Sequence, residues 1–294
     1  MGSFRRISRT GRWCLPAPAA RCLAHWAAVA VIGPFFAQPG APARAAEAVD
    51  LELVLSIDAS GSVDDDEYRL QLGGIAAAFR DPAIMTAISG GVFRRIAVAV
   101  VIWAGASEPR DTTEWWIIGA AADALAFAAM AEARPRVIKG GTTGIGAGVA
   151  ASIELAGAND IIGRRTVIDV SGDGKENSAP GNFLAARDET DAISRAREEA
   201  RARGITINGL AILNDVHDLD QWYDAHVRSG PDSFVMVAED YSDFTAAMLA
   251  KLVREIGSGP AVTDLGGGLA AGERTATTES GSKRSLDQHR YSNR

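Results

Sequence analysis

Residues 51–62, with the sequence LELVLSIDASGS, decide the fold. The first seven are mostly apolar, with three leucines, one valine and one isoleucine, which is typical of a buried β-strand. The run then ends in Asp58, Ser60 and Ser62, so that a carboxylate and two hydroxyls stand close together at the end of a strand. Oxygen ligands spaced this closely suit a small divalent cation such as Mg²⁺. The stretch therefore predicts a buried strand that leads directly into a metal site.

The first 46 residues have the three-part layout of a secretory signal peptide. They hold six arginines, no lysine and no acidic residue, and an apolar stretch at 27–36 follows most of these arginines. Small residues then precede a cleavage position after Ala45 or Ala46. A transmembrane anchor is the alternative, but the apolar run is too short to span a bilayer and Pro34 interrupts it. We therefore expect a periplasmic or secreted protein with no stable membrane insertion after cleavage.

Removal of this leader changes the composition of the remaining chain. Both cysteines, Cys14 and Cys22, lie in the leader, so the rest would depend on its core or on bound metal for stability. Six of the 30 basic residues and none of the 37 acidic ones also lie there, so the formal charge falls from −7 to −13. An acidic surface argues against nucleic acid or an anionic lipid as the main partner.

Strand-like and helix-like segments alternate between residues 47 and 256, which we expect to form one domain. Further strands are predicted at 95–103, 114–118, 166–170, 205–213 and 234–237, and helices at about 64–79, 120–133, 145–153, 186–203, 219–227 and 241–256. The strand at 114–118 can pair with the one before it as a hairpin. The alternation predicts an α/β fold, a doubly wound, mostly parallel, Rossmann-like sheet with helices on both faces. Residues 257–294 are rich in Gly, Ser and Thr, and we expect a disordered tail there.

Ligands of such sheets bind beyond the carboxyl ends of the strands, where the strand order reverses. Asp58 follows the first strand and Asp173 follows the strand at 166–170, so the two carboxylates would meet if these strands are neighbours. Thr142, in the glycine-rich loop at 140–144, would bring a third hydroxyl to the same rim. Asp169 lies inside a central strand, where a hydrogen bond or a charge must satisfy its carboxylate.

Together these elements resemble the von Willebrand factor type A (vWA) domain. The pattern is Asp-x-Ser-x-Ser after the first strand, a threonine in a Gly-Gly-Thr loop, and Asp-Gly after a later strand, and it covers residues 48–256. The segment 167–174, VIDVSGDG, also resembles that of uncharacterised exported bacterial members. Thr143 follows Thr142 directly, where many members have a spacer between two threonines. The resemblance implies a metal-ion-dependent adhesion site (MIDAS) made of Asp58, Ser60, Ser62, Thr142 and Asp173.

The resemblance also implies a function. Three hydroxyls and two carboxylates would hold Mg²⁺, or else Mn²⁺ or Ca²⁺, and leave an open position for an Asp or Glu carboxylate of a partner protein. We therefore expect a protein-binding module and not an enzyme. In integrin-like relatives, a second metal site lies where this chain has Asp65 and Asp66.

Two alternatives stay open: a Mg²⁺-dependent hydrolase that uses the same rim, and a structural envelope protein with a vestigial site. Against the hydrolase, Ser60 stands where Asp-x-Asp enzymes have their second carboxylate, and the sequence has no Gly-x-Ser-x-Gly motif. Single residues also have structural interpretations. Ser62 with Asp65 fits a capping box, Thr142 fits a helix cap, and the two predicted site aspartates fit turns.

Overall fold

The computed structural model describes residues 46–178 and 191–258. Its elements, in chain order, are β1 (Glu47–Val49), β2 (Leu51–Asp58), α1 (Asp65–Arg80), α2 (Pro82–Ser89), β3 (Ile96–Trp103), β4 (Asp111–Thr112), β5 (Trp116–Ile118), α3 (Ala121–Glu132), α4 (Ile145–Gly157), β6 (Ile161–Gly163), β7 (Thr166–Gly172), α5 (Asp191–Ala202), β8 (Ile205–Ile212), α6 (Leu219–His226), β9 (Val235–Ala238) and α7 (Phe244–Gly257). Most of the predicted leader and tail, and the start of the helix predicted at 186–203, lie outside the described residues.

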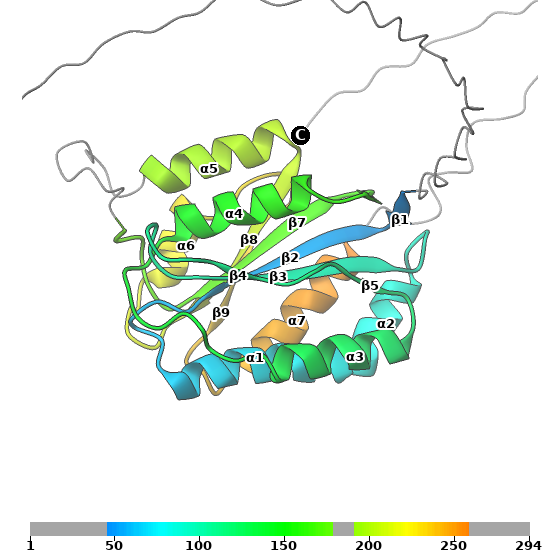
Figure 1. Cartoon of the computed structure of the whole chain (residues 1–294), viewed down its shortest axis with the longest axis horizontal. Helices are drawn as coiled ribbons and strands as arrows, with labels where there is room; N and C mark the ends of the chain where they lie inside the picture. Colours follow the sequence, from blue (N-terminus) through cyan, green and yellow to red (C-terminus); the bar gives the residue numbers. More distant parts are fainter. Residues whose placement is uncertain (1–45, 179–190, 259–294) are drawn as a thin grey trace, which may run out of the picture. The chain divides into compact units, whose positions relative to one another are not determined.

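A mostly parallel sheet forms the centre of the domain (Figure 1). Its strand order is β4-β3-β2-β7-β8-β9, and β4 and β5 pair antiparallel with β3. Because β2 lies between β3 and β7, the strand order reverses at β2. The doubly wound α/β prediction is confirmed, and so is the antiparallel pairing of the segment at 114–118. The short parallel pair of β1 and β6 was not predicted.

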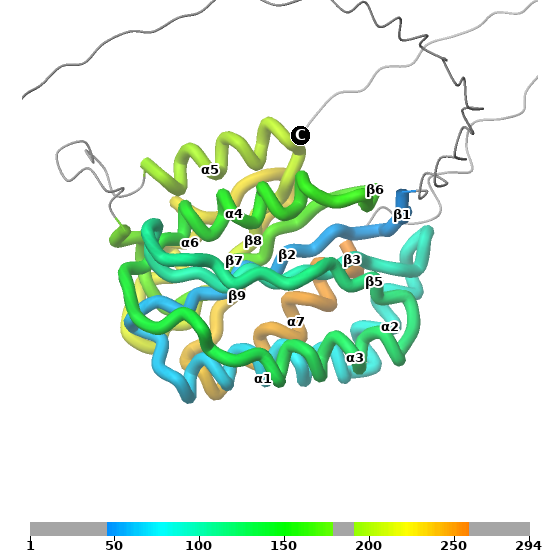
Figure 2. The backbone as a smooth tube through the Cα atoms, in the orientation of Figure 1, coloured from blue at the N-terminus to red at the C-terminus, as the bar shows by residue number. Residues whose placement is uncertain are grey.

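Helices cover both faces of the sheet (Figures 1 and 2). One face packs against α1, α2, α3 and α7, and the other against α4, α5 and α6. Every residue of β2 and of β3 is consequently buried. Central strands that are covered on both faces are mostly apolar along their whole length, and this is why residues 51–57 have no alternating pattern.

Two element boundaries differ from prediction in ways that affect the rim. β7 continues to Gly172, two residues beyond its predicted end, so Asp173 follows the strand directly. α7 begins at Phe244 and not at residue 241, with Asp243 at its N-cap position. Tyr241 therefore lies in the turn before the helix.

A buried ionic cluster joins α7 to the sheet. The Nζ atom of Lys251 lies 2.5 Å from Asp169 Oδ1 in β7 and 2.5 Å from Glu255 Oε1 in α7, and all three side chains are 0% exposed. Asn208 of β8 donates a hydrogen bond to the same oxygen of Glu255 at 2.7 Å. Arg165 donates to the main-chain carbonyl of Glu255. The expectation that a hydrogen bond or a charge accompanies the carboxylate of Asp169 is confirmed by the charge of Lys251.

This cluster predicts a pH dependence of stability. Burial, reinforced by the charge of Glu255, raises the pKa of Asp169 to about 7. A carboxyl group whose pKa is higher in the folded chain binds more protons when folded, so its contribution to stability falls as the pH rises. We expect this contribution to fall between about pH 4 and about pH 7 and to stay low above that range. Asp169→Asn should remove it, and urea unfolding of both proteins across this range measures the difference. Parallel pH profiles would contradict the prediction.

Candidate metal centre

The carboxyl ends of β2 and β7 meet at one rim of the sheet. Ile57 pairs with Ser171 in parallel register, so Asp58 and Asp173 stand next to each other at neighbouring strand ends. Both aspartates are buried, at 0% and 1% exposure. Ser62 Oγ donates a hydrogen bond of 2.6 Å to Asp173 Oδ1 and so links the β2–α1 loop to the loop after β7. The neighbouring strands thus bring together the two carboxylates and the loop between β2 and α1, residues 59–64, which we call the serine loop.

Three hydroxyl groups, those of Ser60, Ser62 and Thr143, lie close together, with Ser60 in the middle. Its Oγ atom lies 3.3 Å from Ser62 Oγ and 3.2 Å from Thr143 Oγ1. The main-chain nitrogen of Ser60 donates to Asp58 Oδ1 at 2.8 Å, which orients that carboxylate. Asp58 is therefore also a turn residue, as its structural interpretation predicted. Only its Oδ1 atom accepts the hydrogen bond of this turn.

The threonine in this cluster is Thr143 and not the predicted Thr142. Thr143 is 4% exposed, whereas Thr142 is exposed and its Oγ1 atom lies over Gly105. Gly140 and Gly141 precede them with φ angles of 77° and 97°, and this left-handed backbone sets which threonine faces the cluster. The sequence offers two adjacent threonines and does not reveal these dihedral angles. Metal binding by the threonine at this position stays a prediction.

Ser62 is not part of a helix cap. Asp64 is the N-cap of α1, and it forms a capping box with Glu67. The capping-box interpretation of Ser62 with Asp65 is therefore wrong. With the cap provided by Asp64, the Ser62 hydroxyl remains available for its bond to Asp173.

Main-chain contacts hold the three loops of the rim together. Gly61 N donates to Gly141 O at 3.0 Å, and a Cβ atom on Gly61 would stand only 2.9 Å from that oxygen. Thr143 N donates to Asn177 Oδ1 at 2.7 Å, and Asn177 N donates back to Thr143 O at 3.0 Å. The loop at residues 140–144 is thus hydrogen-bonded on one side to the serine loop and on the other to the loop that follows Asp173.

The two rim carboxylates are buried without a positive partner among the residues that the structure describes. Within residues 46–178 and 191–258, neither Asp58 nor Asp173 forms an ion pair, and Asp58 Oδ2 has no hydrogen-bond partner. Burial, and then the charge of Asp173, raises the pKa of Asp58 to about 7. Burial also raises the pKa of Asp173, against hydrogen bonds from Ser62 and Tyr241 that lower it. A nearby divalent cation would favour the charged form of both.

Two tyrosines beside the cluster were not predicted. Tyr241 donates a hydrogen bond of 3.0 Å to Asp173 Oδ2. The buried hydroxyl of Tyr223, from α6, has no hydrogen-bond partner among the described residues. This hydroxyl and Asp58 Oδ2 both lie within 2.9 Å of the position that a Cβ atom on Gly172 would take, so Gly172 leaves room for both. Tyrosines in or next to a predicted helix look like ordinary core residues, so only the tertiary structure assigns them to the rim.

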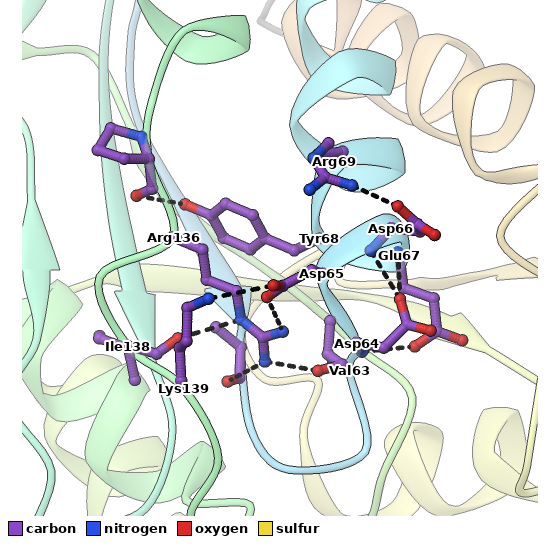
Figure 3. Close-up of polar contacts among 12 residues, drawn as sticks. Val63, Asp64, Asp65, Asp66, Glu67, Tyr68, Arg69, Arg136, Ile138 and Lys139 are labelled. Atoms are coloured by element: carbon purple, nitrogen blue, oxygen red, sulfur yellow. Dashed lines mark hydrogen bonds and ion pairs between the residues drawn. The ribbon is translucent and has the colours of Figure 1, made fainter.

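Ion pairs hold Asp65 and Asp66, the two aspartates at which the resemblance suggested a second metal site (Figure 3). The carboxylate of Asp65 lies 2.9 Å from Arg136 Nη1 and 3.1 Å from Lys139 Nζ. Hydrogen bonds from Lys139 and then from Arg136 lower the pKa of Asp65. Asp66 pairs with Arg69. Positive side chains already balance both charges, and we propose no second metal there.

The donor atoms of the main cluster suit a hard cation. The described part of the chain has no group of three or more His, Cys, Asp or Glu side chains placed to bind a metal. The cluster instead combines two carboxylates with three hydroxyls, and oxygen donors of this kind select Mg²⁺, Mn²⁺ or Ca²⁺ over softer metals. Asp58 Oδ2, which is buried and has no hydrogen-bond partner in the described part of the chain, is the atom that a cation would satisfy.

Sequence comparison assigns the chain to a family. The family described as "Protein of unknown function (DUF1194)" matches residues 48–260, which is most of the chain. The chain belongs to the DUF1194 family. No curated protein sequence matches this DUF1194 protein. Among its described helices, none is both long and apolar enough to cross a membrane.

Solved structures share the fold of the DUF1194 domain. The pilus adhesin SpaC from Lactobacillus rhamnosus GG aligns with a TM-score of 0.52 at 16% identity, over 71% of this chain and 30% of SpaC. The minor pilin PilB from Streptococcus sanguinis aligns with a TM-score of 0.52 at 14% identity, over 72% of this chain and 64% of PilB. The vWF domain of the type V pili tip protein Mfa5 from Porphyromonas gingivalis has a TM-score of 0.44 at 12% identity, over 77% and 98% of the two chains.

The DUF1194 chain spans less than two thirds of either SpaC or PilB. At these identities the likeness concerns the fold. Together with the strand order around β2, it confirms the predicted vWA-like fold.

Proposed function

We propose that this DUF1194 domain is an exported, periplasmic or secreted module that binds a partner protein through a divalent cation. The cation would be held by the oxygens of Asp58, Ser60, Ser62, Thr143 and Asp173. One observation carries the proposal: these side chains meet at one rim, and the two carboxylates among them are buried with no positive partner in the described part of the chain. Burial of two carboxylates is costly unless a cation accompanies them.

The donor set supports a cation that keeps an open position. Hydroxyls are neutral, so only Asp58 and Asp173 offset its charge. A divalent cation bound there supplies a Lewis-acidic position that a carboxylate oxygen of a partner can fill. The chain orients the donors itself, since Asp173 accepts from Ser62 and Asp58 accepts from the main chain of Ser60. We therefore infer a protein ligand that presents Asp or Glu.

The charges around the rim support a strict dependence on metal. Asp215 is an acidic neighbour of both Asp173 and Glu67, and it contributes to the raised pKa of each, after burial as the main cause. An acidic partner would be repelled from this rim without the cation and attracted with it. The same negative charge argues against nucleic acid as a partner. The shared fold of SpaC, a pilus adhesin, agrees with a binding role.

Metal binding is tested by stability. At a concentration about 100 times its dissociation constant, Mg²⁺ or Mn²⁺ should raise the free energy of unfolding by about 2.7 kcal/mol, because it binds only the folded chain. Asp173→Asn should abolish this increase, since it removes one of the two charges that hold the cation. Thermal or urea unfolding with added metal, and with EDTA, measures both effects.

Asp218→Asn is the matched control. Asp218 is an exposed rim aspartate whose carboxylate bonds to Lys175 and not to the cluster, so this variant should keep the full metal response. A wild-type protein whose stability does not increase with Mg²⁺, Mn²⁺ or Ca²⁺ would support the vestigial site and contradict the proposal.

Ligand binding is tested with acidic peptides. In the presence of Mg²⁺, peptides that contain Asp or Glu should bind, whereas their Asn and Gln counterparts should not, and EDTA should release the bound peptide. The hydrolase is distinguished by an assay of phosphoesters with and without Mg²⁺. Turnover that is lost in Asp58→Ala would overturn the binding proposal.

A further inference from the structure

Arg136 lies beside the candidate metal centre, and its side chain is only 10% exposed. Figure 3 shows its guanidinium directed at the loop between β2 and α1. The Nη2 atom faces three carbonyl oxygens of that loop, those of Ala59 at 3.3 Å, Ser60 at 3.4 Å and Val63 at 2.5 Å. One nitrogen thus contacts the loop on both sides of Ser62.

The other nitrogens of the guanidinium fix its own position. Nε donates to Ile138 O at 3.1 Å, and Nη1 donates to the carboxylate of Asp65 at 2.9 Å. The guanidinium also lies 5.8 Å from the centre of the Tyr68 ring in α1. The planar fork of arginine therefore joins the segment after α3 to the serine loop and to the first turn of α1. A lysine ammonium is a single point charge and cannot hold all these positions at once.

We propose that Arg136 is a positioning residue that holds the serine loop in its metal-binding shape before the cation arrives. The inference rests on the proposed function above. Ser60 and Ser62 lie within the segment whose carbonyls contact Nη2, so the guanidinium holds the main chain that carries both hydroxyls. Without it, this loop would gain conformational freedom that metal binding must then remove.

Arg134 provides a matched comparison. It lies two residues earlier, its side chain is 18% exposed, and it makes a comparable set of hydrogen bonds. These bonds go to both carboxylate oxygens of Asp111 and to Thr112 O in β4, and not to the serine loop. Any effect of Arg136 that comes only from lost stability should appear in an Arg134 variant as well.

The experiment compares Arg136→Lys with Arg134→Lys. The first readout is hydrogen exchange of the metal-free proteins at the amides of Gly61 and Val63, which donate to Gly141 O and Ser60 O. We expect exchange at least about tenfold faster than in the wild type for Arg136→Lys, measured relative to the core amide of Leu55, and no such change for Arg134→Lys. The second readout is the dissociation constant of Mn²⁺ by calorimetry, which should rise about tenfold or more for Arg136→Lys alone.

Each outcome decides a separate point. Equal acceleration of the loop amides in both variants, or none in Arg136→Lys, would overturn the positioning role. Faster exchange with an unchanged Mn²⁺ affinity would overturn the link between loop order and metal binding. A wild-type protein that binds none of Mg²⁺, Mn²⁺ and Ca²⁺ would defeat the proposed function, whereas the exchange rates would still decide whether Arg136 orders the loop.

Discussion

Lys251→Met should lower the free energy of unfolding by about 3–5 kcal/mol. The ammonium group of Lys251 lies between Asp169 and Glu255, and all three side chains are 0% exposed. Its removal leaves two carboxylates buried without their cation, and the desolvation cost of unpaired charge is then no longer offset. The loss should appear in urea unfolding at neutral pH. It should shrink as the pH falls, because protonation neutralises the carboxylates that have lost their partner.

Lys139→Met is the control for this prediction. Lys139 also pairs with an aspartate, but its side chain is 62% exposed, and exposed ion pairs contribute at most about 1 kcal/mol. Adding Asp169→Asn to Lys251→Met should recover part of the loss, since it removes one unpaired charge. A loss of less than about 1 kcal/mol for Lys251→Met would contradict the view that this cluster fixes α7 on the sheet.

Trp103→Ala should cost about 3–5 kcal/mol of unfolding free energy. The indole is 0% exposed at the end of β3, and its Nε1 atom donates to Ser56 Oγ at 2.9 Å. It packs against α4 so closely that a Cβ atom on Gly148 would stand 2.6 Å from the ring. The substitution therefore leaves a large cavity between sheet and helix and removes the donor to a buried hydroxyl.

Trp116→Ala is the matched control, because Trp116 is only partly buried where it packs against the opposite side of the sheet. Urea unfolding of both variants measures the two losses. Equal losses would argue that α4 does not depend on the indole of Trp103. Gly148→Ala gives a second check, and it should also destabilise, by about 1–3 kcal/mol, because its methyl group would overlap the ring.

The charged side chains of the domain serve two different purposes. In the Lys251 cluster, an ammonium group of the chain accompanies the buried carboxylates. At the rim, Asp58 and Asp173 are buried with no such group from the described residues. The same fold thus contains one carboxylate cluster that is paired with a lysine and one that is open to an added cation. We therefore expect added metal to stabilise the protein by binding at the rim and not at the Lys251 cluster.

The sequence by itself determined the doubly wound sheet and the rim of the candidate site. The apolar run before Asp58 predicted a central strand, since only a strand covered on both faces has so little polar alternation. Parallel strands place their carboxyl ends at one edge, so the sequence predicted that Asp58 and Asp173 meet if their strands are neighbours. The pairing of β2 with β7 meets that condition, and Ser60 and Ser62 lie in the loop that follows β2.

Only the tertiary structure decided the remaining contacts. Whether Thr142 or Thr143 faces the cluster depends on the backbone angles of Gly140 and Gly141, which the sequence does not reveal. The roles of Arg136 and of Lys251 arise from contacts between segments that are distant in the chain, and neither residue lies in a motif. Local pattern records which face of an element is apolar, whereas the partner of a single polar side chain is set by the packing of the whole domain.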